Sequence, residues 1–444
     1  MNIRARRVLW SFFLAIFLVV SPLLILYALG YKYNWPKKRL EKTGVFFIKS
    51  FPKSADVYLN NEKTGSKTPT QITRLLPKNY EVKISKDGYR SWIKNLEVLP
   101  QTTTFIEDVS LFKEVLNYQL LLSGNFNDFL QSPNQELIAF VETTETNRKI
   151  WLYNQISQNF IELYQTNETN VKLISWSLSS RKILVRQDNQ YLVLNSNQAN
   201  YYTKLSEITG VTMENPKWHT LNDNYLYGLN HNSLYRLDII SQTTEKVTAD
   251  FVLDFQPYGS EVIYLAKSSG QYFLKTDQSG GSQTIFSLPV SGPYLFGLHN
   301  SNLSLLDTSQ QILYLLKLED ENQPVRAVIK NVTNFEWHNT ALVYWNNYEL
   351  WAYFPESGDK TLLERTSQQI KRAFWHPNAA YVFVILADRL KIYELENREK
   401  RNTYDLLVIP DKNENFITTD KKGNNLLMLD EQNGQKGFFE VNIQ

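Results

Sequence analysis

The sequence of 444 residues contains no cysteine. This absence excludes disulfide bonds, cysteine-bound zinc, iron–sulfur clusters and thiol catalysis. Glycine is also scarce, at 17 residues, so the chain is neither collagen-like nor a long flexible linker. Histidine occurs only five times, and residues 113–444 show no long amphipathic helix pattern.

Aromatic residues are abundant. Tyr, Phe and Trp number 26, 24 and 10, which is 14% of the chain, and hydrophobic residues make up 43%. Aromatic and β-branched side chains suit half-buried, pleated surfaces. The composition therefore predicts an all-β protein, and the length allows two or three domains.

One long apolar run lies near the N-terminus. Residues 8–30 carry no charge over about 22 residues, enough for a helix that crosses a bilayer. The run is longer than the core of a typical signal peptide, although Ala28 and Gly30 form a small-x-small pattern that fits cleavage. We interpret residues 8–30 as an uncleaved transmembrane helix and residues 1–7 as a cytoplasmic tail, with a signal peptide as the alternative.

The charge differs between the two ends of the chain. Residues 1–43 hold eight Lys or Arg against one Glu, and residues 113–444 hold 29 basic against 37 acidic residues. A basic linker at residues 31–43 fits the surface of a lipid bilayer, and an acidic body argues against a nucleic-acid partner. Basic residues flank the apolar run on both sides, so charge alone leaves the orientation open. We predict a single-pass cell-membrane protein with an extracytoplasmic body.

Residues 44–112 consist of short alternating strands separated by turn signals, which predicts a small β-sandwich. Its features follow in this order: Ser50-x-Pro52-x-x-Ala55-x-Val57, Gly65-x-x-Thr68-Pro69, Leu75-Leu76-Pro77, Tyr80-x-Val82-x-Ile84 and Lys86-x-Gly88-Tyr89.

This order resembles the PEGA domain over the whole stretch. Two departures from the family pattern are visible: Ser54 and Asn79 stand where the family has glycine. Asparagine tolerates left-handed backbone conformations, so Ser54 is the position where the turn geometry is in question. The resemblance implies a small extracytoplasmic sandwich and says little about a ligand.

Residues 113–444 contain a repeat with a period near 40. Each unit has an anchor residue, which is aromatic or apolar in seven of the eight units, then a polar residue, a polar turn and an apolar strand. The anchors are Gln131, Trp176, Trp218, Phe255, Leu298, Trp337, Trp375 and Ile417. Four strands can be assigned to most units, and this combination is typical of β-propeller blades.

The last unit has only three strands, and residues 114–122 offer the fourth. Pairing the two ends closes a ring and removes free edges. We therefore predict an eight-bladed propeller in residues 113–444, with seven blades as the alternative. The segments at Gln131–Gln135 ("QSPNQ") and Trp375–Ala379 ("WHPNA") resemble the repeats of TolB-type and WD40-like propellers.

Four of the five histidines directly follow an anchor: His219, His299, His338 and His376. Ser132, Ser177, Gln256 and Thr418 hold the same position in the other units. Every one of these side chains can form hydrogen bonds, so we interpret the position as one that satisfies the backbone of the following turn. His299, His338 and His376 come from consecutive units and are a possible patch on the propeller rim.

The sequence indicates no catalytic, cofactor-binding or metal-binding residues. It has no G-x-S-x-G motif for a hydrolase domain and no glycine-rich phosphate loop. We therefore expect a non-catalytic, membrane-tethered binding or scaffold protein whose propeller recognises a protein or a cell-envelope glycan. The alternatives are an extracytoplasmic hydrolase or lyase with an unidentified site in the propeller funnel, and the sensory half of a membrane complex.

Overall fold

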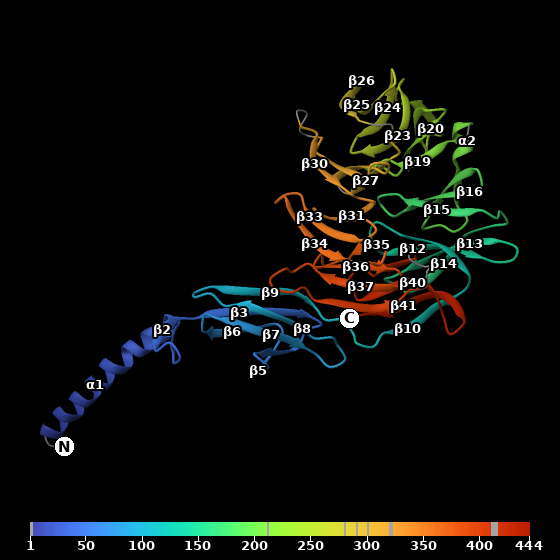
Figure 1. Cartoon of the computed structure of the whole chain (residues 1–444). Helices are drawn as coiled ribbons and strands as arrows, with labels where there is room; N and C mark the ends of the chain where they lie inside the picture. Colours follow the sequence, from blue (N-terminus) through green and yellow to red (C-terminus); the bar gives the residue numbers. More distant parts are fainter. Residues whose placement is uncertain are drawn as a thin grey trace. The chain divides into compact units, whose positions relative to one another are not determined.

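The computed structural model describes residues 3–210, 213–278, 281–289, 292–299, 302–318, 323–409 and 416–444. These residues form two compact units (Figure 1). The N-terminal unit consists of Met1–Leu116, Glu394–Tyr404 and Ile443–Gln444. The repeat unit consists of Asn117–Tyr393 and Asp405–Asn442.

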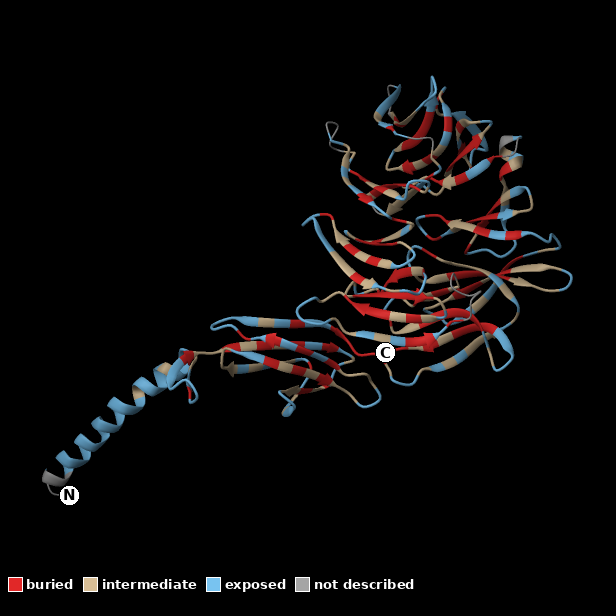
Figure 2. Cartoon of the chain, in the orientation of Figure 1, coloured by how far each residue is buried: buried red, intermediate tan, exposed pale blue. Residues whose placement is uncertain are grey.

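The N-terminal unit begins with helix α1 (Ile3–Ala28), which contains Pro22. Its segment Arg6–Ala28 has a mean hydropathy of 2.6 and no buried residues, and Figure 2 shows the helix as almost entirely exposed. The helix is long and apolar enough to cross a bilayer. It is a candidate membrane anchor, and a signal peptide would have the same properties.

The basic stretch after α1 forms a hairpin of β1 (Tyr31–Asn34) and β2 (Arg39–Lys42). Glu41 accepts a hydrogen bond of 2.7 Å from the Asn34 amide and another of 2.7 Å from Arg39 Nε. These two bonds hold the pKa of Glu41 down at about 2. The residues expected to form a linker therefore have an ordered turn of their own.

The next seven strands form the predicted sandwich. One sheet has the order β6-β3-β9 and the other the order β5-β4-β7-β8. The core between them is apolar and comes from alternating positions, including Phe46, Ile48, Val82 and Trp92. The strands are β3 (Gly44–Phe51), β4 (Asp56–Leu59), β5 (Glu62–Lys67), β6 (Thr70–Leu75), β7 (Asn79–Ser85), β8 (Trp92–Glu97) and β9 (Thr103–Ser110).

Ser54 takes the backbone conformation that glycine would favour. Its φ is +64°, in the left-handed region that side chains other than Gly, Asn and Asp rarely enter. The Ser54 N–H donates a 2.8 Å hydrogen bond to the carbonyl of Thr68. Ser54 thus forms the turn before β4 in place of the family's glycine, and the carbonyl of Thr68 accepts its backbone N–H.

The repeat unit contains eight four-stranded antiparallel sheets among its described residues. Seven of them follow the chain in order. The first three contain β11 (Phe126–Gln131), β12 (Leu137–Thr143), β13 (Arg148–Asn154), β14 (Asn159–Thr166); β15 (Val171–Trp176), β16 (Lys182–Gln187), β17 (Gln190–Asn195), β18 (Tyr202–Lys204); β19 (Glu214–Trp218), β20 (Tyr225–Asn230), β21 (Ser233–Asp238) and β22 (Thr243–Lys246). A short helix, α2 (Leu205–Thr209), follows β18.

The next four sheets follow the same pattern. They contain β23 (Phe251–Tyr258), β24 (Glu261–Ser268), β25 (Gln271–Gln278), β26 (Gly281–Leu288); β27 (Tyr294–His299), β28 (Asn302–Asp307), β29 (Ile312–Leu316), β30 (Val325–Lys330); β31 (Asn334–His338), β32 (Ala341–Trp345), β33 (Glu349–Phe354), β34 (Asp359–Arg365); β35 (Ile370–Trp375), β36 (Tyr381–Leu386), β37 (Arg389–Glu394) and β38 (Thr403–Val408).

The remaining sheet joins the two ends of the repeat unit. Its order is β10-β41-β40-β39, with β10 (Asn117–Ser123), β39 (Ile417–Thr419), β40 (Asn425–Gln432) and β41 (Gln435–Asn442). A Cβ on Gly437 would lie 2.4 Å from Leu120 Cδ1, so glycine permits this close pairing. The strand expected at residues 114–122 is observed at Asn117–Ser123 and pairs with the last sheet, and the number of blades in one ring stays a prediction.

Adjacent sheets share their apolar cores. The first and last sheets meet in a cluster that includes Phe140 and Phe438, whose rings stack with centroids 5.1 Å apart. Other clusters likewise combine residues from consecutive sheets, as Leu306 and Trp337 do. Each sheet therefore buries its faces against its neighbours, which is the packing of a β-propeller.

Candidate binding sites

The anchor tryptophans bond each sheet to the one before it. The indole Nε1 of Trp176 donates to the carbonyl of Leu130 at 3.1 Å, and that of Trp375 donates to the carbonyl of Glu336 at 3.1 Å. Trp218 and Trp337 make the corresponding bonds, to Ser175 O at 3.4 Å and to Ser304 Oγ at 2.8 Å. These indoles are engaged inside the structure, so they position sheets.

At Ser132, Ser177 and His219 the residue after the anchor satisfies the following turn, as predicted. Two other residues at this position bond differently: Gln256 donates to the carbonyl of Pro257 at 3.2 Å, and Thr418 donates to Gln131 Oε1 at 2.6 Å. Ser132 Oγ accepts the N–H of Leu137 at 2.9 Å, and Ser177 Oγ accepts the N–H of Lys182 at 3.1 Å. His219 does the same through Nδ1, which accepts the N–H of Leu221 at 2.9 Å. At these three positions the side chain accepts a hydrogen bond from a backbone N–H group after the anchor.

His376 is buried, with 2% of its surface exposed. Its Nδ1 lies 3.2 Å from the N–H of Asn378, which donates to it, and its Nε2 lies 3.2 Å from the carbonyl of Gly423. A Cβ on Gly423 would lie 2.3 Å from that Nε2, so only glycine fits there. Burial lowers the pKa of His376 to about 4. His376 is therefore not available to a patch on the surface.

His299 and His338 are half-buried. His299 Nε2 accepts the N–H of Asn339 at 3.2 Å, and the His338 ring lies 5.6 Å from the Trp375 ring. Burial lowers the pKa of both imidazoles. Within the described ranges, no group of three or more His, Asp or Glu side chains has the spacing of a metal site. A histidine rim patch stays a prediction, carried by His299 and His338.

A pocket of about 320 Å³ lies beside His299, between β27 and β31, and includes Phe296, Glu336 and Trp337 in its lining. Burial raises the pKa of Glu336, and the opposing attraction of Arg372 only partly offsets this rise. Arg372 also donates to the carbonyl of Ile417 at 3.0 Å. The sequence did not single out Arg372, because nothing in its repeat position distinguishes it.

A second cleft of about 320 Å³ opens at one end of β24, β25 and β26. Its lining mixes polar and apolar residues: Tyr258, Gly259, Ser260, Glu261, Thr276, Gln283, Thr284, Ile285, Leu318 and Pro324. The hydroxyl of Thr276 donates to Glu261 Oε2 at 2.8 Å, which holds one carboxylate oxygen in place. The cleft thus combines one aromatic ring with carboxylate, amide and hydroxyl groups.

A cluster of polar groups also lies inside the β23–β26 sheet. Asp250 Oδ2 receives bonds of 2.9 Å each from Tyr264 OH, Lys275 Nζ and Ser282 Oγ. Tyr264 has no exposed surface, and burial raises its pKa to about 12. These four groups satisfy one another, and the buried phenol cannot reach a substrate. Their role is to hold the sheet together.

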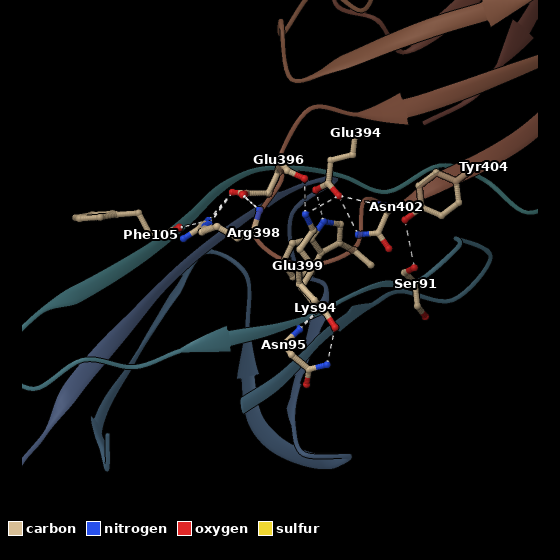
Figure 3. Close-up of polar contacts among 11 residues, drawn as sticks. Ser91, Lys94, Asn95, Phe105, Glu394, Glu396, Arg398, Glu399, Asn402 and Tyr404 are labelled. Carbon is tan, nitrogen blue, oxygen red and sulfur yellow. Dashed lines mark hydrogen bonds and ion pairs between the residues drawn. The ribbon is translucent and has the colours of Figure 1, made fainter. Parts of the chain in front are cut away.

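The N-terminal unit contains a different kind of polar site (Figure 3). Glu394 Oε1 accepts the indole N–H of Trp92 at 2.6 Å, and Glu394 Oε2 lies 3.1 Å from Lys94 Nζ. The Lys94 side chain is 0% exposed and that of Glu394 is 4% exposed. Lys94 also donates to the carbonyl of Glu396 at 2.7 Å. Both members of this buried ion pair therefore have a further hydrogen-bond partner.

Further contacts hold the segment Glu394–Tyr404 in the same unit. Glu399 receives two bonds of 2.7 Å, from the backbone N–H and the side-chain amide of Asn95. These bonds lower the pKa of Glu399. Arg398 donates to the carbonyl of Phe105 at 2.9 Å, and Tyr404 OH donates to the carbonyl of Ser91 at 3.3 Å.

The comparisons with known proteins agree with both predicted resemblances. Residues 43–109 match the model of the PEGA domain. The C-terminal WD40 domain of Sif2 is similar to this chain with a TM-score of 0.52 and 12% identity, covering 74% of this chain and 98% of that one. No curated protein matches the chain.

Other solved structures are similar at the same level. Dipeptidyl peptidase 4 of Porphyromonas gingivalis has a TM-score of 0.51 and 10% identity, covering 73% of this chain and 58% of that one. The Dos1 propeller has a TM-score of 0.47 and 13% identity, covering 73% and 94%. At such identities the likeness shows the fold alone. The chain therefore combines a candidate membrane helix, a segment that matches the PEGA domain and a β-propeller fold.

Proposed function

We propose that this chain is a membrane-tethered binding or scaffold protein. In this proposal α1 stays uncleaved in the bilayer, and the PEGA domain and propeller lie outside the cytoplasm. The propeller recognises a protein or a cell-envelope glycan and performs no catalysis. The hydropathy of α1 supports the tether, and the PEGA match supports an extracytoplasmic location.

The observation that carries the proposal is the cleft at β24–β26. Its volume of about 320 Å³ is at the lower end of the range for ligand pockets, enough for one sugar residue. A sugar ring presents an apolar face and several hydroxyl groups. Tyr258 offers an aromatic surface for the former, and Glu261 and Gln283 offer acceptors and donors for the latter. The lining therefore favours a glycan over a broad protein interface.

The test measures binding of short cell-envelope saccharides to the full chain in detergent, by calorimetry and saturation-transfer NMR. We expect Glu261→Gln and Gln283→Ala to weaken binding at least tenfold. Glu245→Gln is the matched control, because Glu245 is exposed and its ion pair with Arg236 lies outside the cleft lining. Equal binding by the cleft variants and the control would contradict the proposed site.

The same samples separate the alternatives. Shortened or unsaturated saccharide products would favour a hydrolase or a lyase. If no saccharide binds, crosslinking in cells followed by mass spectrometry decides whether a protein partner contacts the cleft instead. If no saccharide binds and no crosslink involves the cleft residues, the cleft binds neither a glycan nor a protein, which would contradict the proposal.

A further inference from the structure

Lys94 stands where a core residue is expected. Along β8 the side chains of Trp92, Lys94 and Leu96 share the buried face, while the residues between them are exposed. Trp92 and Leu96 belong to the apolar core of the sandwich. An ammonium group in such a position is costly unless it is paired and hydrogen-bonded. The sandwich strands do not supply that pairing, and Glu394 does.

The free edge of the same strand is also occupied. β8 is the outermost strand in the sheet order β5-β4-β7-β8. The backbone N–H of Asn95 donates to Glu399 at 2.7 Å instead of to a neighbouring strand. An unprotected edge strand offers unpaired backbone groups to other chains. The Glu399 carboxylate closes this edge where an incoming strand would otherwise pair.

We propose that β8 of the PEGA domain is a receptor for peptides that carry two carboxylates five residues apart. Trp92 and Lys94 bind the first carboxylate on the buried face, and Asn95 binds the second at the strand edge. Residues Glu394–Tyr404 are the ligand that the chain itself provides. This receptor is independent of the cleft in the repeat unit and goes beyond the proposed function.

Hydrogen bonds and an ion pair within the segment Glu394–Tyr404 fix its conformation. Asn402 donates to Glu394 Oε2 through its backbone N–H at 3.1 Å and through its side-chain amide at 3.0 Å. Arg398 pairs with Glu396 at 2.6 Å. The two Asn402 bonds hold the first carboxylate, that of Glu394, where Trp92 and Lys94 contact it. Because the segment is part of the same chain, its effective concentration is high, and a free peptide competes poorly with it.

The test uses the full chain in detergent and a fluorescent peptide of residues 393–404. The double variant Glu394→Ala/Glu399→Ala removes both carboxylates from the internal ligand. We expect it to bind the peptide at least tenfold more tightly than the wild-type chain does. Adding Lys94→Met should abolish that gain, and Gln283→Ala in the cleft should leave it unchanged.

Glu145→Ala/Glu207→Ala is the matched control, since it removes two exposed carboxylates from the repeat unit. It should bind the peptide as weakly as wild type. A peptide with glutamine at positions 394 and 399 should not bind any variant. Equal binding of the two peptides, or no gain in the double variant, would overturn the proposal.

A second measurement covers the case in which the double variant does not fold. Excess peptide is added to the wild-type chain, and hydrogen exchange is followed by mass spectrometry. We expect faster exchange at the Asn402 amide, which loses Glu394 as its acceptor when the segment is displaced. If hydrogen exchange at the Asn402 amide stays unchanged at millimolar peptide, the peptide does not displace the segment, which would contradict the proposal.

Discussion

The tryptophan indoles of the two units donate hydrogen bonds over very different distances along the chain. In the repeat unit, Trp375 bonds Glu336 across 39 residues and Trp176 bonds Leu130 across 46. In the N-terminal unit, Trp92 bonds Glu394 across 302 residues. The first kind recurs with the period of the sheets and joins neighbours. The Trp92–Glu394 bond belongs to a single site. There, the buried ammonium group of Lys94 depends on the Glu394 carboxylate as its counter-charge.

The largest expected effect comes from breaking the single long-range pair. Glu394→Ala leaves the Lys94 ammonium buried without a counter-charge, which costs about 3–5 kcal/mol of unfolding free energy. Denaturant unfolding followed by tryptophan fluorescence measures the loss, and Trp92 reports on the site directly.

The matched control replaces the whole pair. Lys94→Met/Glu394→Leu removes both charges and keeps similar side-chain volumes, so it should cost far less than Glu394→Ala alone. If the two variants lose the same unfolding free energy, the loss comes from altered packing. The N-terminal unit would then not depend on this charge pair, contrary to the contrast drawn between the two units.

The next largest effect comes from pH acting on the repeat unit. The pKa of His376 is about 4 in the folded chain against about 6.5 when unfolded. Below pH 6.5 the unfolded chain binds a proton that the folded chain does not, so stability falls as pH falls. The loss between pH 7 and pH 5 should be about 2 kcal/mol. His376→Gln should flatten this dependence in thermal unfolding curves; an unchanged slope would mean that other groups cause it.

The smallest effect is expected at the repeated tryptophan bonds. Trp375→Phe and Trp176→Phe each remove one indole donor to a carbonyl of the preceding sheet, at about 0.5–1.5 kcal/mol apiece, besides the smaller ring volume. The two sites are far apart in the sequence and share no partner, so their effects should add. A double variant that loses much more than the sum would show that the repeated bonds act as one network, contrary to the comparison.

Periodicity explains which features could be predicted. The strands, the anchors and the pairing of β10 with β41 follow from a pattern that recurs about every 40 residues. The residue after each anchor was interpreted correctly for Ser132, Ser177 and His219, because eight examples showed that the position needs a hydrogen-bonding side chain. Burial was not predictable from the same pattern: His376 and His338 look alike in sequence, but only His376 meets Gly423 from the next sheet.

The site in the N-terminal unit could not be predicted for a related reason. Its partners lie 302 residues apart and occur at one place, so no internal comparison reveals them. One signal was present in the sequence: in "WIKNLE" (Trp92–Glu97) a lysine occupies the phase of the buried positions. Such a lysine indicates a missing counter-charge without naming it. The cleft at Glu261 could not be predicted either, because its lining comes from the ends of two different sheets.

The pairing of β10 with β41 also has a consequence in time. Synthesis adds about 5–20 residues per second, and β10 ends at Ser123 whereas β41 begins at Gln435. The first strand of the repeat unit therefore waits on the order of tens of seconds for its partner. During that interval the backbone groups of β10 lack their partner strand and are open to pairing with other chains.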